Sequence, residues 1–176
     1  MRTKDTTDQN LANALKTLMA QKPFEKITIG EICDLAKLNR RNFYRHFKDK
    51  YALLQWIFRV ECFDSIDFDN PTNLEDKLPA LCYYLYKNRK LYASGFNYTG
   101  QNSLVEYITK ILTPYFEKEY PFDFFCEEQK EILYRHIVQF GIDLFMSWFQ
   151  GKPDMTPDEF CAHILDQLHF VKAKLK

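Results

Sequence analysis

The chain has 176 residues, 46% hydrophobic and 16% aromatic, so it can form one domain, or a small domain joined to a second, around a sizeable core. Its formal net charge is zero, so total charge neither indicates nor excludes a nucleic-acid partner. Five widely spaced cysteines argue against a disulfide framework, and neither an apolar leader nor an uncharged stretch of about 18 residues occurs. We therefore expect a cytoplasmic protein that is neither exported nor inserted in a membrane.

The charge is unevenly distributed along the chain. Residues 1–58 contain eleven Lys or Arg and six Asp or Glu, a net charge of +5, whereas residues 59–176 carry a net charge of −5. A basic N-terminal part suits a polyanion, and an acidic remainder would be repelled by it. We predict two domains, 1–58 and 59–176, with a linker over residues 64–73, where Asp, Asn and Pro accumulate.

Helical periodicity dominates the sequence, and signals for strands are nearly absent. There are only five glycines and no Asn-Gly or Asp-Gly pair of the kind that closes hairpins. The sequence therefore predicts an all-α protein of about nine helices, with a three-helix helix-turn-helix head followed by a C-terminal helical bundle. The first helix should run from residues 5–7 to about residue 21, because Pro23 prevents its continuation.

The second and third helices carry clear start signals. Thr28 and Glu31 form a T-x-x-E capping box, which predicts that the second helix begins just after Thr28. Residues 36–38 should form the turn, and Asn39 can cap the third helix.

The third helix has an apolar side and a basic side. Phe43 and Phe47, four residues apart, should anchor it to the core, which turns Arg41 and Arg45 outward. After Phe47, Asp49 can cap a fourth helix that runs to about residue 65, with its inner face formed by Leu53, Leu54, Ile57 and Phe58.

A basic face of this kind can bind the major groove of DNA. Arg matches guanine and Asn matches adenine through paired hydrogen bonds, each worth about 1 to 3 kcal/mol of discrimination. We predict that the base-reading residues are Arg40, Arg41 and Asn42, and that the phosphate-binding residues are Thr28, Lys37, Tyr44, Arg45, His46, Lys48 and Lys50. The alternative is that an Arg-rich face is only a solvated surface.

Residues 8–58 resemble the N-terminal DNA-binding domain of the TetR family of transcriptional regulators. The matching residues are Thr28, Ile32, Ala36, Phe43, Tyr44, Arg45, His46, Phe47, Lys50, Leu53 and Leu54. The resemblance implies a bacterial homodimer that places one recognition helix in each half of a roughly palindromic operator, with a helical C-terminal body that dimerises and senses a signal. It also implies base contacts from Arg40, Arg41 and Asn42 and phosphate contacts from Tyr44, His46 and Lys50.

The chain departs from the family pattern at the turn. Lys37 stands where many members have Gly, so a positive φ there would carry a steric cost. Segments at residues 54–58, 85–89 and 100–103 are similar to the subgroup of dihydroxyacetone-kinase regulators. Such proteins can act as activators through a protein partner. The second interpretation is therefore a regulator-like module whose main partner is a protein, with DNA binding secondary.

The remaining chain should be helical. We expect helices near residues 74–87, 89–97, 101–120, 127–150 and 157–174. Pro79 and Pro114 fall inside two of these, where each would mark a kink or a misplaced boundary. Thr156, Pro157 and Glu159 form a strong start signal for the last helix.

The last two helices are rich in apolar residues, which predicts a four-helix dimer interface between copies, although both could be ordinary core helices. An aromatic group could line a ligand pocket or simply fill the core; it comprises Tyr83, Tyr84, Tyr86, Tyr92, Phe96, Tyr98, Tyr107, Tyr115 and Phe116. The sequence does not assign individual ligand contacts.

No catalytic constellation is present in the sequence. The four histidines form no H-E-x-x-H motif, and the Cys161-x-His163 pair is too sparse for a metal site. A Gly-rich phosphate loop and a G-x-S-x-G motif are also absent. We expect a non-enzymatic protein without a cofactor or metal.

Overall fold

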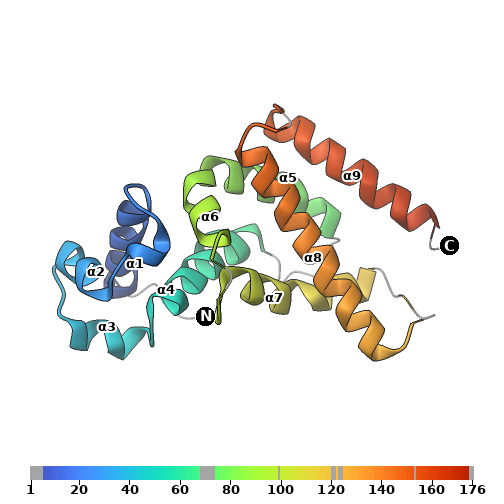
Figure 1. The fold of residues 1–176 in the computed structure, drawn as a ribbon. Helices are drawn as coiled ribbons and strands as arrows, with labels where there is room; N and C mark the ends of the chain where they lie inside the picture. The colour runs from blue at the N-terminus through green and yellow to red at the C-terminus, as the bar shows by residue number, and fades with distance from the viewer. Residues whose placement is uncertain are drawn as a thin grey trace.

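The computed structural model describes residues 6–67, 74–98, 100–119, 122, 125–152 and 154–174. All regular structure in these residues is helical, which confirms the predicted all-α class. Figure 1 shows α1, α2 and α3 grouped at one end of the molecule, with α4 leading from them into the body formed by α5 to α9.

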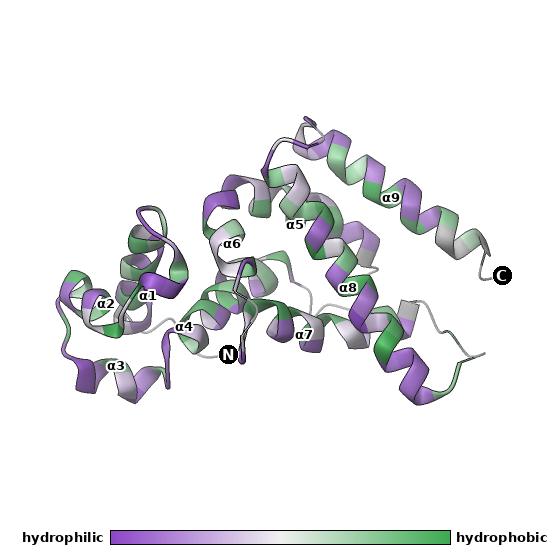
Figure 2. Ribbon diagram, viewed as in Figure 1, coloured by the Kyte–Doolittle hydropathy of each residue, from purple (hydrophilic) through white to green (hydrophobic). Residues whose placement is uncertain are grey.

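The N-terminal head consists of α1 (Thr6–Met19), the 3-10 turn η1 (Phe24–Lys26), α2 (Ile29–Ala36) and α3 (Arg40–His46). The starts of α2 and α3 agree with the sequence-based prediction because each of these helices begins at a local cap. One face of every head helix enters a common core that includes Leu11, Leu15, Phe24, Ile32 and Phe43, all fully buried. The opposite face of α3 is mainly hydrophilic (Figure 2).

The helix that follows the head has about the predicted length but is less regular than predicted. α4 (Lys50–Ile57) continues without a break into a π-helical segment, η2 (Phe58–Phe63), and a 3-10 turn, η3 (Asp64–Ile66). Such π turns are rare, and no periodic pattern in the sequence predicts them. The predicted domain boundary at residues 58 and 59 falls within this run. Of the predicted linker, residues 68–73 lie outside the described residues.

The body contains α5 (Leu74–Lys87), α6 (Arg89–Phe96), α7 (Leu104–Glu119), α8 (Glu127–Phe149) and α9 (Pro157–Lys174). Pro79 and Pro114 lie inside α5 and α7, so neither marks a misplaced boundary. The start signal of α9 forms as predicted, since Thr156 N–H donates to Glu159 Oε2 at 2.8 Å and Glu159 N–H donates to Thr156 Oγ1 at 3.3 Å.

The last two helices meet at an aromatic corner. Trp148 stacks on Phe160 with ring centroids 4.1 Å apart, and its Nε1–H donates to the Met155 carbonyl at 2.8 Å. Away from this corner, α9 packs against α5, whereas α8 packs against α7 and α6. The two helices therefore diverge from their shared turn (Figure 1).

Two further properties bear on function. No helix among the described residues is long and apolar enough to cross a membrane. All five cysteines are free thiols, and only Cys126 is exposed.

Candidate nucleic-acid interface

The outward face of α3 is fixed by its caps and anchors. Asn39 Oδ1 accepts a hydrogen bond from Asn42 N–H at 2.8 Å, which satisfies one of the free amides at the start of the helix. Phe43 is fully buried and Phe47 nearly so. Because both rings are held in the core, α3 cannot rotate about its axis.

The turn between α2 and α3 has the strained geometry that the sequence suggested. Lys37 adopts φ 57° and ψ 41°, the left-handed conformation. Its N–H donates to the Asp34 carbonyl at 3.2 Å, and Leu38 N–H donates to the Cys33 carbonyl at 2.9 Å, which closes the C-terminus of α2. A side chain in this conformation carries a steric cost that Gly avoids.

We expect Lys37→Gly to raise the free energy of unfolding by about 0.5 to 1 kcal/mol, because release of the left-handed strain outweighs the larger chain entropy of Gly in the unfolded state. Urea denaturation followed by circular dichroism would measure this change. The same variant removes an exposed cation, so its affinity for DNA should fall as its stability rises. A loss of stability would show that the Lys37 side chain makes compensating contacts.

Most of the predicted DNA-contacting side chains lie on the surface. Arg41, Tyr44, Arg45, Lys48 and Lys37 are exposed, with Tyr44 57% exposed, and Asn42 is half-buried. Arg40 is also exposed but lies back over α2: a Cβ built on Gly30 would be only 2.8 Å from Arg40 Nη2. Gly30 therefore leaves the space that this guanidinium occupies.

Thr28 is engaged within its own capping box. Its hydroxyl accepts from Glu31 N–H at 3.3 Å and donates to Glu31 Oε2 at 2.9 Å, and its N–H donates to the same carboxylate oxygen at 2.9 Å. The Lys22 ammonium and the Thr28 donors lower the pKa of Glu31 to about 2. Since a carboxylate already occupies the first turn of α2, this end of the helix is poorly suited to the phosphate predicted there.

His46 is tied to the first helix. Its Nδ1 lies 2.7 Å from Oδ1 of Asp8, a buried carboxylate on α1. This contact links the C-terminal end of α3 to α1 and sets the plane of the imidazole ring. A phosphate contact from His46 would therefore have to use the other ring nitrogen, Nε2.

The Lys50 ammonium is hydrogen-bonded inside the head. Its ammonium donates to three backbone carbonyls, those of Phe24 at 2.8 Å, Glu25 at 2.9 Å and Ile27 at 2.8 Å. It also lies 4.8 Å from the centre of the Phe24 ring. An ammonium has three donors, and all three are used here. In this structure Lys50 therefore links α4 to the η1 segment.

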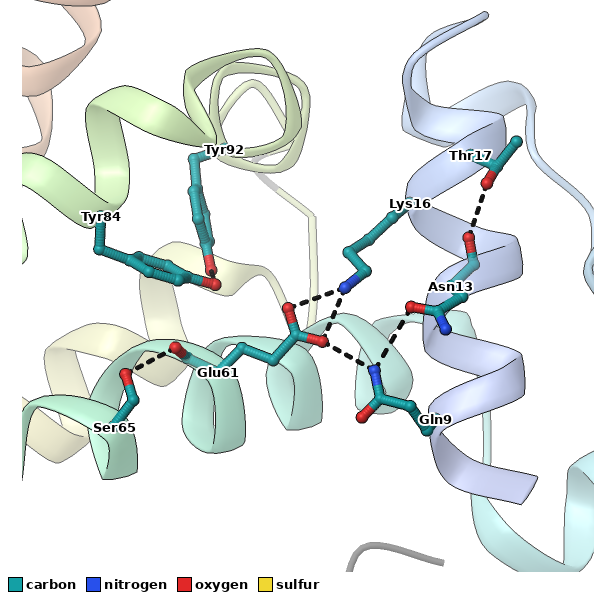
Figure 3. Close-up of polar contacts among 8 residues, drawn as sticks. All are labelled: Gln9, Asn13, Lys16, Thr17, Glu61, Ser65, Tyr84 and Tyr92. Atoms are coloured by element: carbon teal, nitrogen blue, oxygen red, sulfur yellow. Dashed lines mark hydrogen bonds and ion pairs between the residues drawn. The ribbon is translucent and has the colours of Figure 1, made fainter. Parts of the chain in front are cut away.

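A second polar cluster joins the head to the body (Figure 3). Glu61, in the π-helical segment η2, pairs with Lys16 on α1 through both carboxylate oxygens, at 2.7 and 2.9 Å. Gln9 Nε2 donates to Glu61 Oε1 at 3.1 Å. Neither Glu61 nor Asp8 stands in a motif, and their partners are far away in the sequence. Only the fold reveals them.

The body contains a cavity of about 420 Å³ between α5, α7, α8 and α9. Of the aromatic group predicted as a possible pocket, only Phe96 and Phe116 line it. Most of the tyrosines pack elsewhere, although Tyr83 is exposed; Tyr92, for example, donates to the Tyr84 hydroxyl at 3.1 Å, and burial raises the pKa of both. Of the two interpretations left open for this aromatic group, core packing therefore describes most of its tyrosines.

Fold and site together define a helix-turn-helix DNA-binding regulator, with a basic, exposed second helix set by a tight turn. The model for bacterial regulatory proteins of the TetR family matches residues 11–57, and the model for a transcriptional regulator C-terminal region of that family matches residues 72–169. The chain belongs to the TetR family of transcriptional regulators. These proteins are regulators rather than enzymes, in agreement with the sequence analysis.

One similar protein is named as a transcriptional activator. The chain is 31% identical over 91 residues to the HTH-type dhaKLM operon transcriptional activator DhaS of Lactococcus lactis subsp. lactis strain IL1403, a match that covers 51% of this chain and 49% of that protein. The aligned region thus spans about half the length of this curated relative.

Solved structures share the fold over nearly the whole chain. A structure of the dihydroxyacetone kinase operon activator DhaS is 21% identical, with a TM-score of 0.58 over 93% of this chain and 94% of that one. A TetR transcriptional regulator from Streptococcus agalactiae 2603V is 19% identical, with a TM-score of 0.65 over 92% of each chain.

Proposed function

We propose that the protein acts in the cytoplasm as a homodimer that binds a roughly palindromic operator and is controlled by an effector bound to its C-terminal region. The observation that carries the proposal is the exposed basic face of α3, held outward by Phe43 and Phe47 in a TetR-family head. Arg40, Arg41 and Asn42 would read base edges in the major groove.

The phosphate-binding set is smaller than the sequence suggested. Lys37, Tyr44, Arg45 and Lys48 are exposed around α3, and His46 stands at its end, so these five residues are proposed to contact the DNA backbone. Lys50 and Thr28 leave the set because their polar groups are used inside the head. Positive side chains around the helix would fix its register on the duplex.

The dimer is proposed to form through α8 and α9. Three large apolar side chains on these helices are exposed in the single chain: Ile132 by 48%, Phe140 by 58% and Phe170 by 65%. Packing these helices against their copies in a four-helix arrangement would cover that surface. Sedimentation velocity tests this point, since a monomer at micromolar concentration would contradict it.

A second candidate function has a protein, rather than DNA, as the main partner. The relative from Lactococcus lactis is named as a transcriptional activator. Activation usually requires contact with another protein, so the alternative is a regulator whose main partner is a protein, with DNA binding secondary. Co-purification with a second polypeptide, together with weak DNA binding by the protein alone, would favour this alternative.

Gel-shift titration with DNA from upstream of the gene tests the main proposal. We expect a retarded complex whose affinity falls steeply as the salt concentration rises, because phosphate contacts release counterions. Absence of a salt-sensitive complex at low salt would overturn the proposal.

Arg41→Ala should lower discrimination between operator and mutated operator by about 1 to 3 kcal/mol, because it removes a proposed base contact. Lys48→Ala is the matched control from the same exposed surface. It should weaken binding to all sequences alike and reduce the salt slope by about 1, since it removes a phosphate contact. Competition gel shifts at several salt concentrations separate the two effects. Equal, uniform weakening would show that Arg41 reads no base.

A further inference from the structure

The body cavity has walls of one chemical kind. Its lining is formed almost wholly by aliphatic and phenylalanine side chains, among them Leu78, Leu85, Ile108, Phe116, Leu144 and Ile164. None of the residues found around it in the described chain is Lys, Arg, Asp or Glu. Among the described lining residues, the side chains with hydrogen-bonding groups are His136 and Gln167. The volume of about 420 Å³ is within the range of small-molecule sites.

The two polar residues lie toward the open side of the cavity. His136 is exposed and Gln167 half-buried. Gln167 Nε2 lies 2.9 Å from His163 Nε2 on the preceding turn of α9. A ligand would therefore place its apolar part deep between the helices and any polar group near the rim formed by His136 and Gln167.

Gly141 supports a function for the volume of the cavity. Gly141 lies in the interior of α8, where Gly destabilises a helix relative to Ala. Its backbone does not need Gly, because its φ is not positive. Nor does crowding exclude a side chain, since a Cβ at this position would meet no atom within 4 Å. Gly141 lines the cavity, so its missing side chain leaves cavity volume that any other residue would fill.

We propose that this cavity binds an uncharged molecule with a hydrocarbon body and a small polar group, and that Gly141 keeps the space for it. The proposal rests on the effector control proposed above and names the chemical class of the effector. A charged group would lose hydration without gaining a partner of opposite charge, and a polyol would leave most of its hydroxyls unpaired.

The test uses the full-length protein and the neutral fluorescent probe 1-N-phenylnaphthylamine. We expect the probe to bind with enhanced emission and 1-decanol to displace it. Decanoate at pH 8 should need a concentration about tenfold higher, because its carboxylate has no cationic partner in the cavity. Glycerol should not displace the probe. Displacement by glycerol, or by decanoate as readily as by 1-decanol, would overturn the assignment.

Two substitutions at one position provide the matched pair. Gly141→Leu should weaken binding of the probe and of 1-decanol by at least about tenfold, because its side chain fills the cavity. Gly141→Ala adds only a methyl group and should retain binding. Both variants should melt no lower than the natural protein, since each removes a helix-interior Gly. If Gly141→Leu bound the probe normally, the cavity would not be the site.

Two further measurements distinguish the ligand proposal from the proposed DNA-binding function and from a role of Gly141 in the dimer. Gly141→Leu should still shift operator DNA, so failure of DNA binding by the natural protein would count against the proposed function and not against the ligand site. Sedimentation of Gly141→Leu should match that of the natural protein. Loss of the dimer in this variant would show that Gly141 serves close approach of a partner helix, and the ligand proposal would then be wrong.

Discussion

Replacement of Lys50 by methionine is expected to lower the free energy of unfolding by about 2 to 4 kcal/mol, because three backbone carbonyls lose the charged donor that they share. Methionine keeps much of the apolar length of the side chain, so the change removes mainly the ammonium. Denaturation in urea, followed by tryptophan fluorescence and circular dichroism, measures the loss. The η1 segment should also exchange its amide hydrogens faster, since Lys50 holds it against α4.

Lys48→Met is the matched control for this experiment. Lys48 is exposed two residues earlier and has no hydrogen bond to the η1 carbonyls. Its replacement should leave stability within about 0.5 kcal/mol of the natural protein and should reduce DNA affinity. If Lys50→Met were as stable as Lys48→Met and bound DNA more weakly, Lys50 would be a phosphate ligand, as the family resemblance implied.

Trp148→Ala is expected to destabilise the protein by about 3 to 5 kcal/mol, the usual cost of removing a buried aromatic side chain. Trp148 is 1% exposed, stacks on Phe160 and on Tyr86, and fixes the corner from which α8 and α9 diverge. Loss of this corner should also weaken the dimer, since the proposed interface uses both helices. Equilibrium denaturation gives the first effect, and sedimentation at several concentrations gives the second.

Trp148→Phe separates stacking from hydrogen bonding at the same position. It keeps an aromatic ring but leaves the Met155 carbonyl without its donor, so the expected cost is smaller, about 1 to 3 kcal/mol. If the Phe variant lost as much stability as the Ala variant, the hydrogen bond rather than the ring stack would dominate the corner.

Local signals explain why the helix bounds were predictable. The capping box of Thr28 and Glu31, the cap at Asn39 and the start of α9 at Thr156 all involve residues three positions apart. Such contacts form within one turn of helix, so they can be recognised in the sequence without knowledge of the fold. The inward direction of Phe43 followed in the same way from helical periodicity.

The side-chain contacts at the site that the sequence did not predict join distant segments of the chain. Lys50 bonds to carbonyls more than twenty residues away, and His46 pairs with Asp8 on another helix. The cavity is likewise defined by which helices diverge, so the aromatic composition of the body did not identify its lining. A π-helical segment leaves no periodic pattern. These features arise from tertiary packing and lie beyond motif or spacing arguments.

The π-helical segment η2 contacts both the body cavity and the DNA-binding head, which provides a route for coupling ligand binding to DNA binding. Phe58, its first residue, lines the body cavity, and Glu61, three residues later, holds α1 of the DNA-binding head through Lys16. If a ligand at Phe58 changes operator affinity by some factor, linkage requires operator DNA to change ligand affinity by the same factor. Effector binding measured on free protein and on the DNA complex would then differ, and the ratio of the two constants gives the coupling between cavity and head.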